Sequence, residues 1–379
     1  MLPCMKTKAA VLHNAEQPLP YANSQPMVIE EIVLDGPGEG EVLVEVKGAG
    51  LCHSDLSVIN GSRPRPMPMV LGHEASGIVR EVGQGVYGFA PDDHVIFTFI
   101  PSCGMCRYCA EGRPSLCEPG MDANNAGTLM NGGQRFSSNG KPYFHHCGVS
   151  GYSQFTITLP SSLVKIDKSL PFELATLFGC AVMTGTGAAI NTANIRPGQS
   201  VAIFGLGGVG LAALMGAKAC NAGQIIAVDV HPNRLQMAVE LGADQVIRAE
   251  GGPVSEKIFS ILEHGVDFAF DTSTISAVML DAIASLAPRG TFGYAAPPDD
   301  TEGTLPLPMR PLMLGRKIVG ILEGNSNPEV FIPQLVDYHM QGKFPFNRLV
   351  KFYPFDEINK AFHDSEAGTT IKPILQMAP

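Results

Sequence analysis

The fold is decided by residues 200–229, which read SVAIFGLGGVGLAALMGAKACNAGQIIAVD. The segment Val201–Phe204 is apolar and has the length of a short strand, and residues 211–220 can continue as a helix. The turn between them carries glycines in the G-x-G-x-x-G spacing, at Gly205, Gly207 and Gly210. The stretch therefore predicts a strand, a tight turn and a helix in that order.

This turn is suited to a pyrophosphate, because no side chain separates the backbone from the ligand and the helix N-terminus offers free N–H groups. A second apolar run, residues 224–230, includes Asp229, 24 positions after Gly205. A carboxylate there accepts hydrogen bonds from both ribose hydroxyls and repels a 2′-phosphate, which favours NAD over NADP. A glycine-rich buried helix is the alternative interpretation. The predicted cofactor-binding residues of the turn are Gly205, Gly207, Gly208, Val209 and Gly210.

Composition bounds the class of protein. A chain of 379 residues is too long for one ordinary core and suits two domains. Its 45% hydrophobic and 16% charged content is typical of a globular protein, and its net charge of −10 gives no reason to expect nucleic acid as a partner. The first residues contain no apolar run of signal-peptide length, so we expect a cytoplasmic protein with no membrane partner.

The rhythm of the chain changes near Pro197. Before it, short strands alternate with Gly and Pro, and residues 42–47 alternate apolar and polar side chains as a half-buried strand does. After it, strands and helices alternate, which is typical of a doubly wound parallel sheet. The tail after Gly324 is expected to rejoin the front domain. The six predicted strands are 201–205, 225–229, 245–247, 266–271, 290–295 and 318–321.

Four cysteines lie within fifteen residues, at Cys103, Cys106, Cys109 and Cys117. Four thiolates at this density satisfy tetrahedral Zn²⁺ completely, so we expect a structural zinc site in a lobe at about residues 101–120. Three more candidate ligands, Cys52, His73 and Cys180, are spread along the chain. Together they would form a Cys₂His site with an open fourth position, although each alone is more often an ordinary core residue.

The motifs GLCHSDL (50–56), GHEASGIVREVG (72–83), the four-cysteine run and FGLGGVG (204–210) resemble the zinc-dependent alcohol dehydrogenases of the medium-chain dehydrogenase/reductase superfamily. The resemblance covers nearly the whole chain. It implies a mostly-β GroES-like catalytic domain interrupted by a Rossmann domain, with residues 1–182 and 325–379 in the former and 183–324 in the latter. It also implies two zinc ions per chain, one catalytic and one structural, and NAD.

The same resemblance implies roles at the catalytic zinc, which Cys52, His73 and Cys180 would hold. Glu74 would serve as an alternate ligand, Asp55 would orient His73, and Ser54 would take the proton of the alcohol. The alternatives are surface carboxylates for the two acids and a helix N-cap for the serine. Ser57 stands where several relatives have a histidine that passes the proton to solvent, so the route of proton exit stays open.

Further residues match positions that the family uses around the cofactor and the substrate. His53 and Lys372 would lie at the pyrophosphate, Arg234 at the adenosine ribose, and Thr184 with Val209 behind the nicotinamide ring. Phe99, His146 and Cys147 would line the alcohol pocket, where a polar histidine departs from the apolar residues of many relatives. Segments 321–335 and 342–346 look like the aryl-alcohol dehydrogenase branch.

These matches predict reversible hydride transfer from a primary alcohol of aryl, allylic or medium-chain type to NAD, giving an aldehyde. Residues 118–148 resemble an insertion of dimeric members, so we expect a homodimer built through the Rossmann sheets. One alternative is glutathione-dependent formaldehyde oxidation, which needs a cationic cluster that the front domain does not show in sequence. Another is a non-catalytic zinc- and NAD-binding redox sensor.

Overall fold

The computed structural model describes residues 4–299, 301 and 303–377, and its chain divides into two compact units. Unit 1 comprises Met1–Cys180, Asn327–Tyr338 and Phe346–Pro379, and unit 2 comprises Ala181–Ser326 and His339–Pro345. The sequence predicted domain boundaries after residues 182 and 324. It also predicted that residues 325–379 return to the first domain as one piece, whereas His339–Pro345 cluster with unit 2. Unit 1 therefore takes its residues from both ends of the chain.

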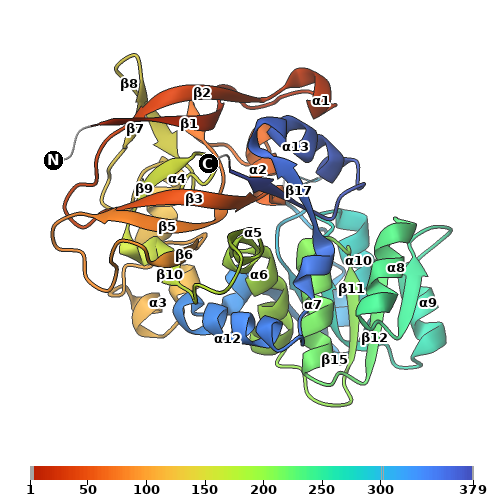
Figure 1. Ribbon diagram of the computed structural model, residues 1–379. Coiled ribbons are helices and arrows are strands. Elements are labelled where there is room, and N and C mark those ends of the chain that lie inside the picture. The colour runs from red at the N-terminus through yellow and green to blue at the C-terminus, as the bar shows by residue number, and fades with distance from the viewer. Residues whose placement is uncertain (1–3, 300, 302, 378–379) are drawn as a thin grey trace. The chain divides into compact units, whose positions relative to one another are not determined.

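Unit 2 is built on a six-stranded parallel sheet with the strand order β13-β12-β11-β14-β15-β16. Its strands β11, β12 and β15 are labelled in Figure 1. This is the order of a doubly wound Rossmann sheet, as predicted. All five residues of β11 are buried, because helices cover both faces of such a sheet. The strands are β11 (Ser200–Phe204), β12 (Gln224–Asp229), β13 (Gln245–Arg248), β14 (Val266–Asp271), β15 (Leu286–Tyr294) and β16 (Lys317–Gly320).

The helices of unit 2 alternate with these strands, and Ala202, Phe204, Ile226, Ile258 and Phe292 belong to the core between them. The α-helices are α6 (Ala181–Gly187), α7 (Gly208–Ala219), α8 (Pro232–Leu241), α9 (Val254–Ile261), α10 (Ser276–Ala284) and α11 (Met309–Leu312). Two shorter helical segments complete the unit, η4 (Ala188–Thr192) and η5 (Glu323–Asn325).

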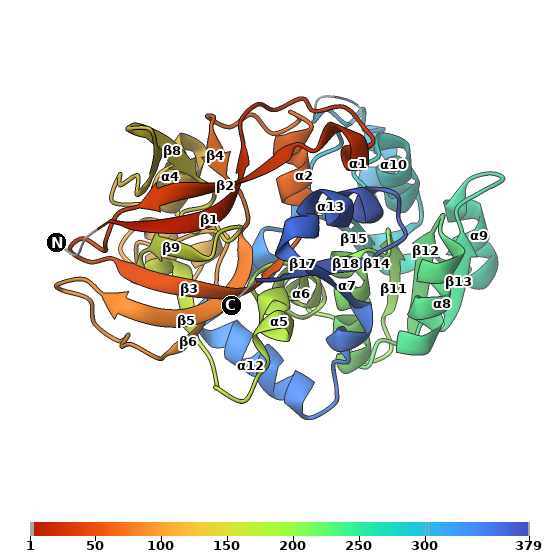
Figure 2. The ribbon, with the colours of Figure 1, turned by 45° about the horizontal axis from the view of Figure 1, so that its top comes forward.

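Unit 1 is mostly β, as expected of a GroES-like domain, and its first sheet is a closed barrel with the order β1-β2-β7-β8-β4. Its strands β1, β2, β4 and β8 are labelled in Figure 2. Val11, Ile32, Val70, Phe136 and Ile157 pack in the core beside it. Two of its strands lie in the segment that we interpreted as an insertion, so that segment completes a barrel. The strands are β1 (Met5–Leu12), β2 (Met27–Leu34), β4 (Met69–Val70), β7 (Phe136–Ser138) and β8 (Lys141–His145).

The second sheet of unit 1 has the order β10-β6-β5-β3-β18-β17, with β9 paired to β3. Its central strand begins with the predicted alternation, because Val42, Val44 and Val46 are buried and the residues between them are partly exposed. The strands are β3 (Val42–Gly50), β5 (Glu74–Val82), β6 (His94–Phe97), β9 (Phe155–Thr158), β10 (Leu163–Lys165), β17 (Val350–Pro354) and β18 (Lys372–Gln376).

Short helices connect the strands of unit 1, and α12 begins in unit 1 and ends in unit 2. The α-helices are α1 (Tyr21–Ser24), α2 (His53–Ile59), α3 (Arg107–Ala110), α4 (Glu118–Ala126), α5 (Phe172–Ala175), α12 (Pro328–Met340) and α13 (Ile358–Glu366). The 3₁₀ segments are η1 (Pro114–Leu116), η2 (Pro160–Ser162), η3 (Thr176–Gly179), η6 (Phe346–Leu349) and η7 (Phe355–Glu357).

Within the described part of the chain, no single helix combines the length and the apolar character needed to cross a membrane. The helical segments Phe172–Gly179 and Ala181–Thr192 meet that test only when they are counted together, by length and composition alone.

Candidate active site

Strand pairing in unit 1 brings distant candidate ligands together. β3 pairs antiparallel with β5, with Gly50 opposite Glu74, so the residues just past these positions, Cys52 and His73, come close in space. β18 pairs with the other edge of β3, with Ile374 opposite Gly50, which adds Lys372 to the same end of the sheet. The site is therefore assembled by sheet register, although its members are up to 320 residues apart.

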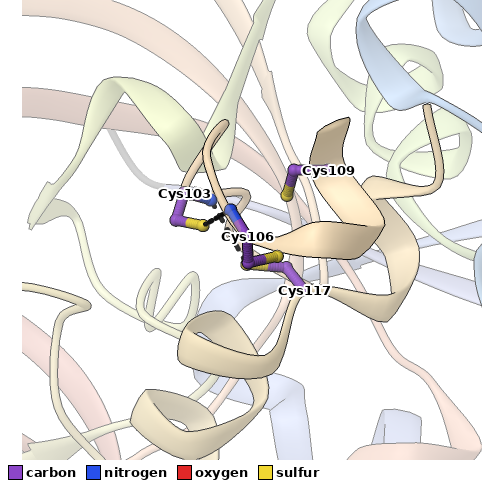
Figure 3. Close-up of side chains that lie close together, drawn as sticks. All are labelled: Cys103, Cys106, Cys109 and Cys117. Carbon is purple, nitrogen blue, oxygen red and sulfur yellow. Dashed lines mark hydrogen bonds between the residues drawn. The ribbon is translucent and has the colours of Figure 1, made fainter. Parts of the chain in front are cut away.

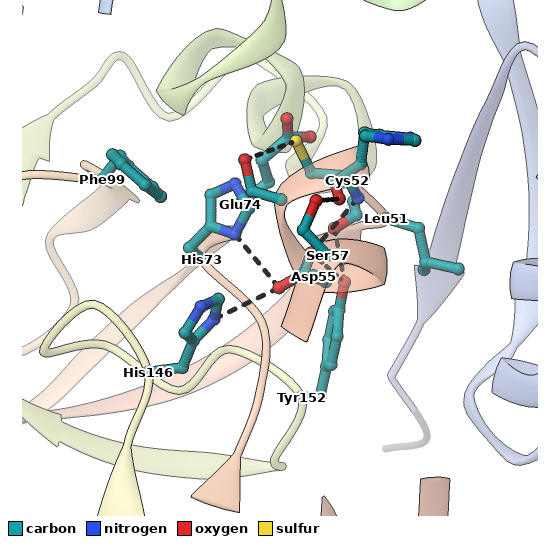
Figure 4. Close-up of polar contacts among 12 residues, drawn as sticks. Leu51, Cys52, Asp55, Ser57, His73, Glu74, Phe99, His146 and Tyr152 are labelled. Carbon is teal, nitrogen blue, oxygen red and sulfur yellow. Dashed lines mark hydrogen bonds and ion pairs between the residues drawn. The ribbon is translucent and has the colours of Figure 1, made fainter. Parts of the chain in front are cut away.

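The candidate catalytic metal site is a cluster of four side chains, Cys52, His73, Glu74 and Cys180 (Figure 4). One ligand atom from each residue lies within 4.8 Å of every other, and all but Cys52 are buried. The distances suit convergence on one ion, and two thiols with an imidazole are ligands that zinc prefers. This donor set fits the open zinc site that the sequence predicts.

Asp55 fixes the orientation of His73. The Nδ1–H of His73 donates to Asp55 Oδ1 at 3.1 Å, since an ionised carboxylate can only accept. The Nε2 atom of His73 is buried and finds no hydrogen-bond partner among the described residues. A buried lone pair without a partner is costly in a folded protein, and coordination of a metal would satisfy it.

Asp55 is held as a carboxylate from several sides. Its Oδ2 accepts hydrogen bonds from the hydroxyl of Tyr152 at 2.8 Å and from the backbone N–H of Cys52 at 3.2 Å. Burial disfavours the charged form, but electrostatic attraction and hydrogen bonds from His73 and His146 outweigh it and hold the pKa of Asp55 well below its usual range. The backbone contact also caps α2, whose N-cap residue is Cys52. The alternative of Ser54 as the helix N-cap is therefore wrong.

Glu74 and Lys372 form a buried ion pair beside the cluster. Burial raises the pKa of Glu74 to about 7, with the charge of Lys372 acting in the opposite direction. Lys372 also donates to the backbone carbonyl of Leu51 at 2.8 Å. The structure thus gives Lys372 partners at the candidate metal site, and a contact of this residue with the cofactor pyrophosphate stays a prediction.

The two cysteines of the cluster differ in acidity. A hydrogen bond from the Cys180 thiol, helped by interactions with His73 and by the positive charge of Lys372, lowers the pKa of the Cys52 thiol. The same hydrogen bond and burial raise the pKa of Cys180. Because the thiolate is the form that binds metal, Cys52 is the better ligand before an ion arrives.

Ser54 lies in the first turn of α2 with its hydroxyl 3.8 Å from the sulfur of Cys52. It is therefore next to the cluster, as its predicted role in proton transfer requires. Ser57 donates to the backbone carbonyl of His53 at 3.1 Å, so its one hydroxyl proton is used within the helix. His53 itself is exposed at the start of α2, and its contact with the cofactor stays a prediction.

Two of the three predicted pocket residues contact His73 (Figure 4). The ring centre of Phe99 lies 5.0 Å from that of His73, and the ring centre of His146 lies 5.5 Å away, both edge to face. His146 also places Nδ1 3.2 Å from Asp55 Oδ1. Cys147 follows in sequence and is likewise buried. One wall near His73 is thus polar as well as aromatic, as the sequence indicated.

The four-cysteine run forms a second cluster in which all ligand atoms lie within 4.8 Å of one another (Figure 3). Two sulfurs accept backbone hydrogen bonds of 3.2 Å, Cys103 from the N–H of Cys106 and Cys117 from the N–H of Cys103. The cluster offers four sulfur ligands and fits a closed, structural zinc site.

The glycine-rich turn of unit 2 has the geometry that the sequence predicted. Gly205 has φ of +85°, which side chains rarely adopt, and a Cβ at Gly210 would lie 1.9 Å from the carbonyl oxygen of Gly205. A Cβ at Gly207, in contrast, would meet no protein atom within 4 Å. Gly207 is also the N-cap residue of α7, so the open space faces a helix N-terminus that suits a pyrophosphate.

Asp229 ends β12 and holds the turn in place. Its two carboxylate oxygens accept the backbone N–H groups of Leu206 at 2.7 Å and His231 at 2.8 Å. Arg234 approaches with Nη1 3.7 Å from Asp229 Oδ2, and its buried Nε has no hydrogen-bond partner among the described residues. Their predicted contacts with the adenosine ribose are compatible with this arrangement and stay predictions.

Thr184 and Val209 were expected behind the nicotinamide ring. Thr184 is buried in α6 and Val209 is half-buried in the first turn of α7. Both belong to unit 2, as does the glycine-rich turn. Their contact with the nicotinamide ring stays a prediction.

Sequence reasoning missed three features of unit 1. The first is Tyr152, whose hydroxyl contacts Asp55, and the second is the pairing of Lys372 with Glu74. The third is a pair of neighbouring arginines, Arg63 and Arg65, in a domain where we expected no cationic cluster. Only the spacing of the arginines in the sequence RPRP (63–66) could have signalled any of these.

Comparisons with known proteins agree with this geometry. Residues 38–168 match the model of the alcohol dehydrogenase GroES-like domain, and residues 208–337 match that of the zinc-binding dehydrogenases. The chain is 40% identical over 360 residues to geraniol dehydrogenase of Castellaniella defragrans, covering 92% of this chain and 94% of that protein.

Two solved structures are similar over 99% of this chain and 100% of their own. An alcohol dehydrogenase zinc-binding domain protein from Burkholderia ambifaria has a TM-score of 0.92 at 39% identity. Benzyl alcohol dehydrogenase from Acinetobacter calcoaceticus has a TM-score of 0.91 at 35% identity.

Proposed function

This chain belongs to the zinc-binding alcohol dehydrogenases of the medium-chain dehydrogenase/reductase superfamily, and from that premise we propose that it oxidises primary alcohols of aryl, allylic or medium-chain type to aldehydes. It is an NAD-dependent enzyme of the alcohol oxidoreductase class. Geraniol is an allylic alcohol and benzyl alcohol an aryl one, and the relatives named for them support this substrate range.

The observation that carries the proposal is the arrangement of Cys52, His73 and Cys180, with the Nε2 atom of His73 left without a hydrogen-bond partner. These three residues would hold the catalytic zinc, and Glu74 would serve as an alternate ligand. When bound, zinc supplies Lewis acidity at the oxygen of an alcohol or aldehyde.

The residues of the chain supply binding, orientation and proton movement. Asp55 keeps the Nδ1 proton on His73 and thereby presents Nε2 as the ligand atom. Ser54, beside the sulfur of Cys52, would accept the proton of the alcohol hydroxyl. The turn at Gly207 would hold NAD, to which the hydride is transferred. Ser57, whose proton is already donated to His53, could act only as an acceptor in onward proton transfer.

The four-cysteine cluster supports a second, structural zinc, so the proposal includes two zinc ions per chain. A cytoplasmic location is part of the same proposal, because thiolates that bind metal must stay reduced. All nine cysteines of the chain carry free thiols in the structure.

We include a homodimer in the proposal. β16 is an outer strand of the unit 2 sheet, so one of its edges is available to pair with a second copy. Met309, Met313 and Leu314 are exposed in the segment just before it. Size-exclusion chromatography with light scattering should give the mass of two chains, and the mass of four would contradict this part of the proposal.

The activity is tested by following NADH at 340 nm with geraniol, benzyl alcohol and butanol, together with metal analysis. We expect two zinc ions per chain, NADH formation with the first two alcohols and its loss after chelation. Cys180→Ser should abolish activity and bring the zinc content toward one, whereas Cys220→Ser, outside both clusters, serves as the matched control. Full activity of Cys180→Ser would refute the assignment of the catalytic metal site.

A further inference from the structure

Two arginines, Arg63 and Arg65, are two residues apart in unit 1 and repel each other electrostatically, although the chain as a whole carries a net charge of −10. The Arg63 guanidinium lies over the ring of Phe99, 5.3 Å from its centre. That ring is itself 5.0 Å from the ring of His73, a candidate ligand of the catalytic zinc. The Arg63 guanidinium is therefore at most about 10 Å from the centre of the His73 ring, because the two distances share the ring of Phe99.

Arg65 adds a second positive charge to this wall. Its Nε is buried and has no hydrogen-bond partner among the described residues, and its Nη1 donates to the carbonyl of Pro64 at 2.9 Å. Burial and the neighbouring charge of Arg63 lower the pKa of Arg65, and the thiol of Cys147 is the acidic group that offsets this. The charge of Arg65 thus interacts with both Arg63 and the pocket residue Cys147.

Neither arginine forms an ion pair with a carboxylate of any residue that the structure describes. Elsewhere in this unit, partly buried arginines are paired: Arg135, for example, binds Glu41 at 2.8 Å. Two half-buried like charges near each other repel, and a bound anion would offset that repulsion.

The backbone that carries the pair is stiff. Arg63 is tied to α2 by a 2.8 Å bond from its N–H to the carbonyl of Ser57, and Pro64 and Pro66 each fix φ around Arg65. Pro66 packs against Gly127, where a Cβ would lie 2.9 Å from the proline ring. A segment held in this way presents its side chains with little loss of backbone entropy when a ligand binds.

We propose that Arg63 and Arg65 bind a carboxylate carried by the alcohol substrate, at the end of the molecule remote from the reacting hydroxyl. This inference rests on the proposed function and narrows it from neutral alcohols to those that bear an anionic group. The guanidinium fork is the side chain best suited to bind a carboxylate through two hydrogen bonds. Phe99, which contacts both Arg63 and His73, would contact the body of an aryl substrate.

The test compares benzyl alcohol with 3- and 4-(hydroxymethyl)benzoate on the zinc-loaded enzyme with NAD. We expect kcat/KM for at least one carboxylate to exceed that for benzyl alcohol by about 10-fold or more, the range for charge-assisted hydrogen bonds. The methyl ester of the preferred acid should lose this advantage, and added salt should reduce it. S-hydroxymethylglutathione, a larger substrate with carboxylates, is tested in the same way, by the ratio of its kcat/KM to that of benzyl alcohol.

Arg63→Gln and Arg65→Gln should each lower the ratio of carboxylate to benzyl alcohol kcat/KM by about 10-fold. The exposed Arg196→Gln, in unit 2, is the matched control and should keep the wild-type ratio. Either arginine variant suffices if the other fails to fold. Equal rates for charged and neutral alcohols, or a ratio that both variants leave unchanged, would overturn this inference alone. Absence of NADH with every alcohol would overturn the proposed function as well.

Discussion

Acidification should destabilise unit 1 through one buried histidine. His145, at the end of β8, is fully buried, and its Nε2 accepts a hydrogen bond from the N–H of Arg135 at 3.2 Å. Its Nδ1 lies 3.4 Å from the hydroxyl of Ser150, and its ring centre lies 4.8 Å from that of Phe136. Burial, helped by the charge of Arg135, lowers the pKa of His145 to about 3.

The sign and size follow from linkage. In the unfolded chain the pKa of a histidine is about 6.5, so protonation there stabilises the unfolded state as the pH falls below that value. The stability contributed by His145 is therefore complete above pH 6.5 and is lost progressively between about pH 6.5 and pH 3. At pH 5, which is about 1.5 pH units below the pKa of the unfolded state, the free energy of unfolding is therefore lower than at pH 7 by roughly 2 kcal/mol.

Native-state hydrogen exchange on peptides covering residues 141–158 measures this loss, after correction for intrinsic exchange rates. His145→Gln keeps an acceptor for the N–H of Arg135 and removes the titrating group. Between pH 7 and pH 5 the opening free energy should therefore fall by about 2 kcal/mol more in the wild type than in this variant. The partly exposed His363→Gln should behave as the wild type does. Equal falls in the wild type and His145→Gln would refute the reasoning.

Three further predictions concern other sites. Burial raises the pKa of Asp271 to about 6, so its contribution to stability is present at acid pH and is lost as the pH rises from about 4 to 6. Asp271→Asn should therefore stabilise unit 2 at pH 7 by up to about 3 kcal/mol in chemical denaturation and give no gain at pH 4. Gly207→Val should weaken NADH binding in a fluorescence titration with little change in Tm, whereas Gly210→Ala should lower Tm, and the reverse pattern would contradict the turn geometry. Tyr152→Phe removes a hydrogen bond to Asp55 and should weaken zinc binding by about 10-fold in competition with a chelator, while unchanged affinity would exclude a role for this hydroxyl.

The parts of the fold that were predictable are those with a local pattern. The alternation in β3 reflects burial of one face of the strand, and the apolar run of β11 reflects burial of both faces. The glycine spacing reflects the tight turn at Gly205. The strands β7 and β8 were missed because they are short and close the barrel through pairing with distant strands. That pairing depends on partners that a local window does not contain.

The candidate site divides in the same way. Its ligands could be proposed because Cys52, His73 and the cysteine cluster lie in short motifs that resemble a known family. The contact of Tyr152 with Asp55 and the pairing of Lys372 with Glu74 could not be proposed, because each joins residues that are far apart in the sequence. Lys372 reaches Glu74 through the pairing of β18 and β5 with β3. Contacts of this kind leave no periodicity in the sequence.

Every side chain of the candidate metal cluster belongs to unit 1, and the glycine-rich turn belongs to unit 2. A substitution that disrupts one of these two sites should therefore leave the other intact, so a variant that no longer binds the dinucleotide should still bind zinc. Because the two sites lie in different units, substitutions in unit 2 can change the coenzyme preference during evolution without altering the metal ligands in unit 1.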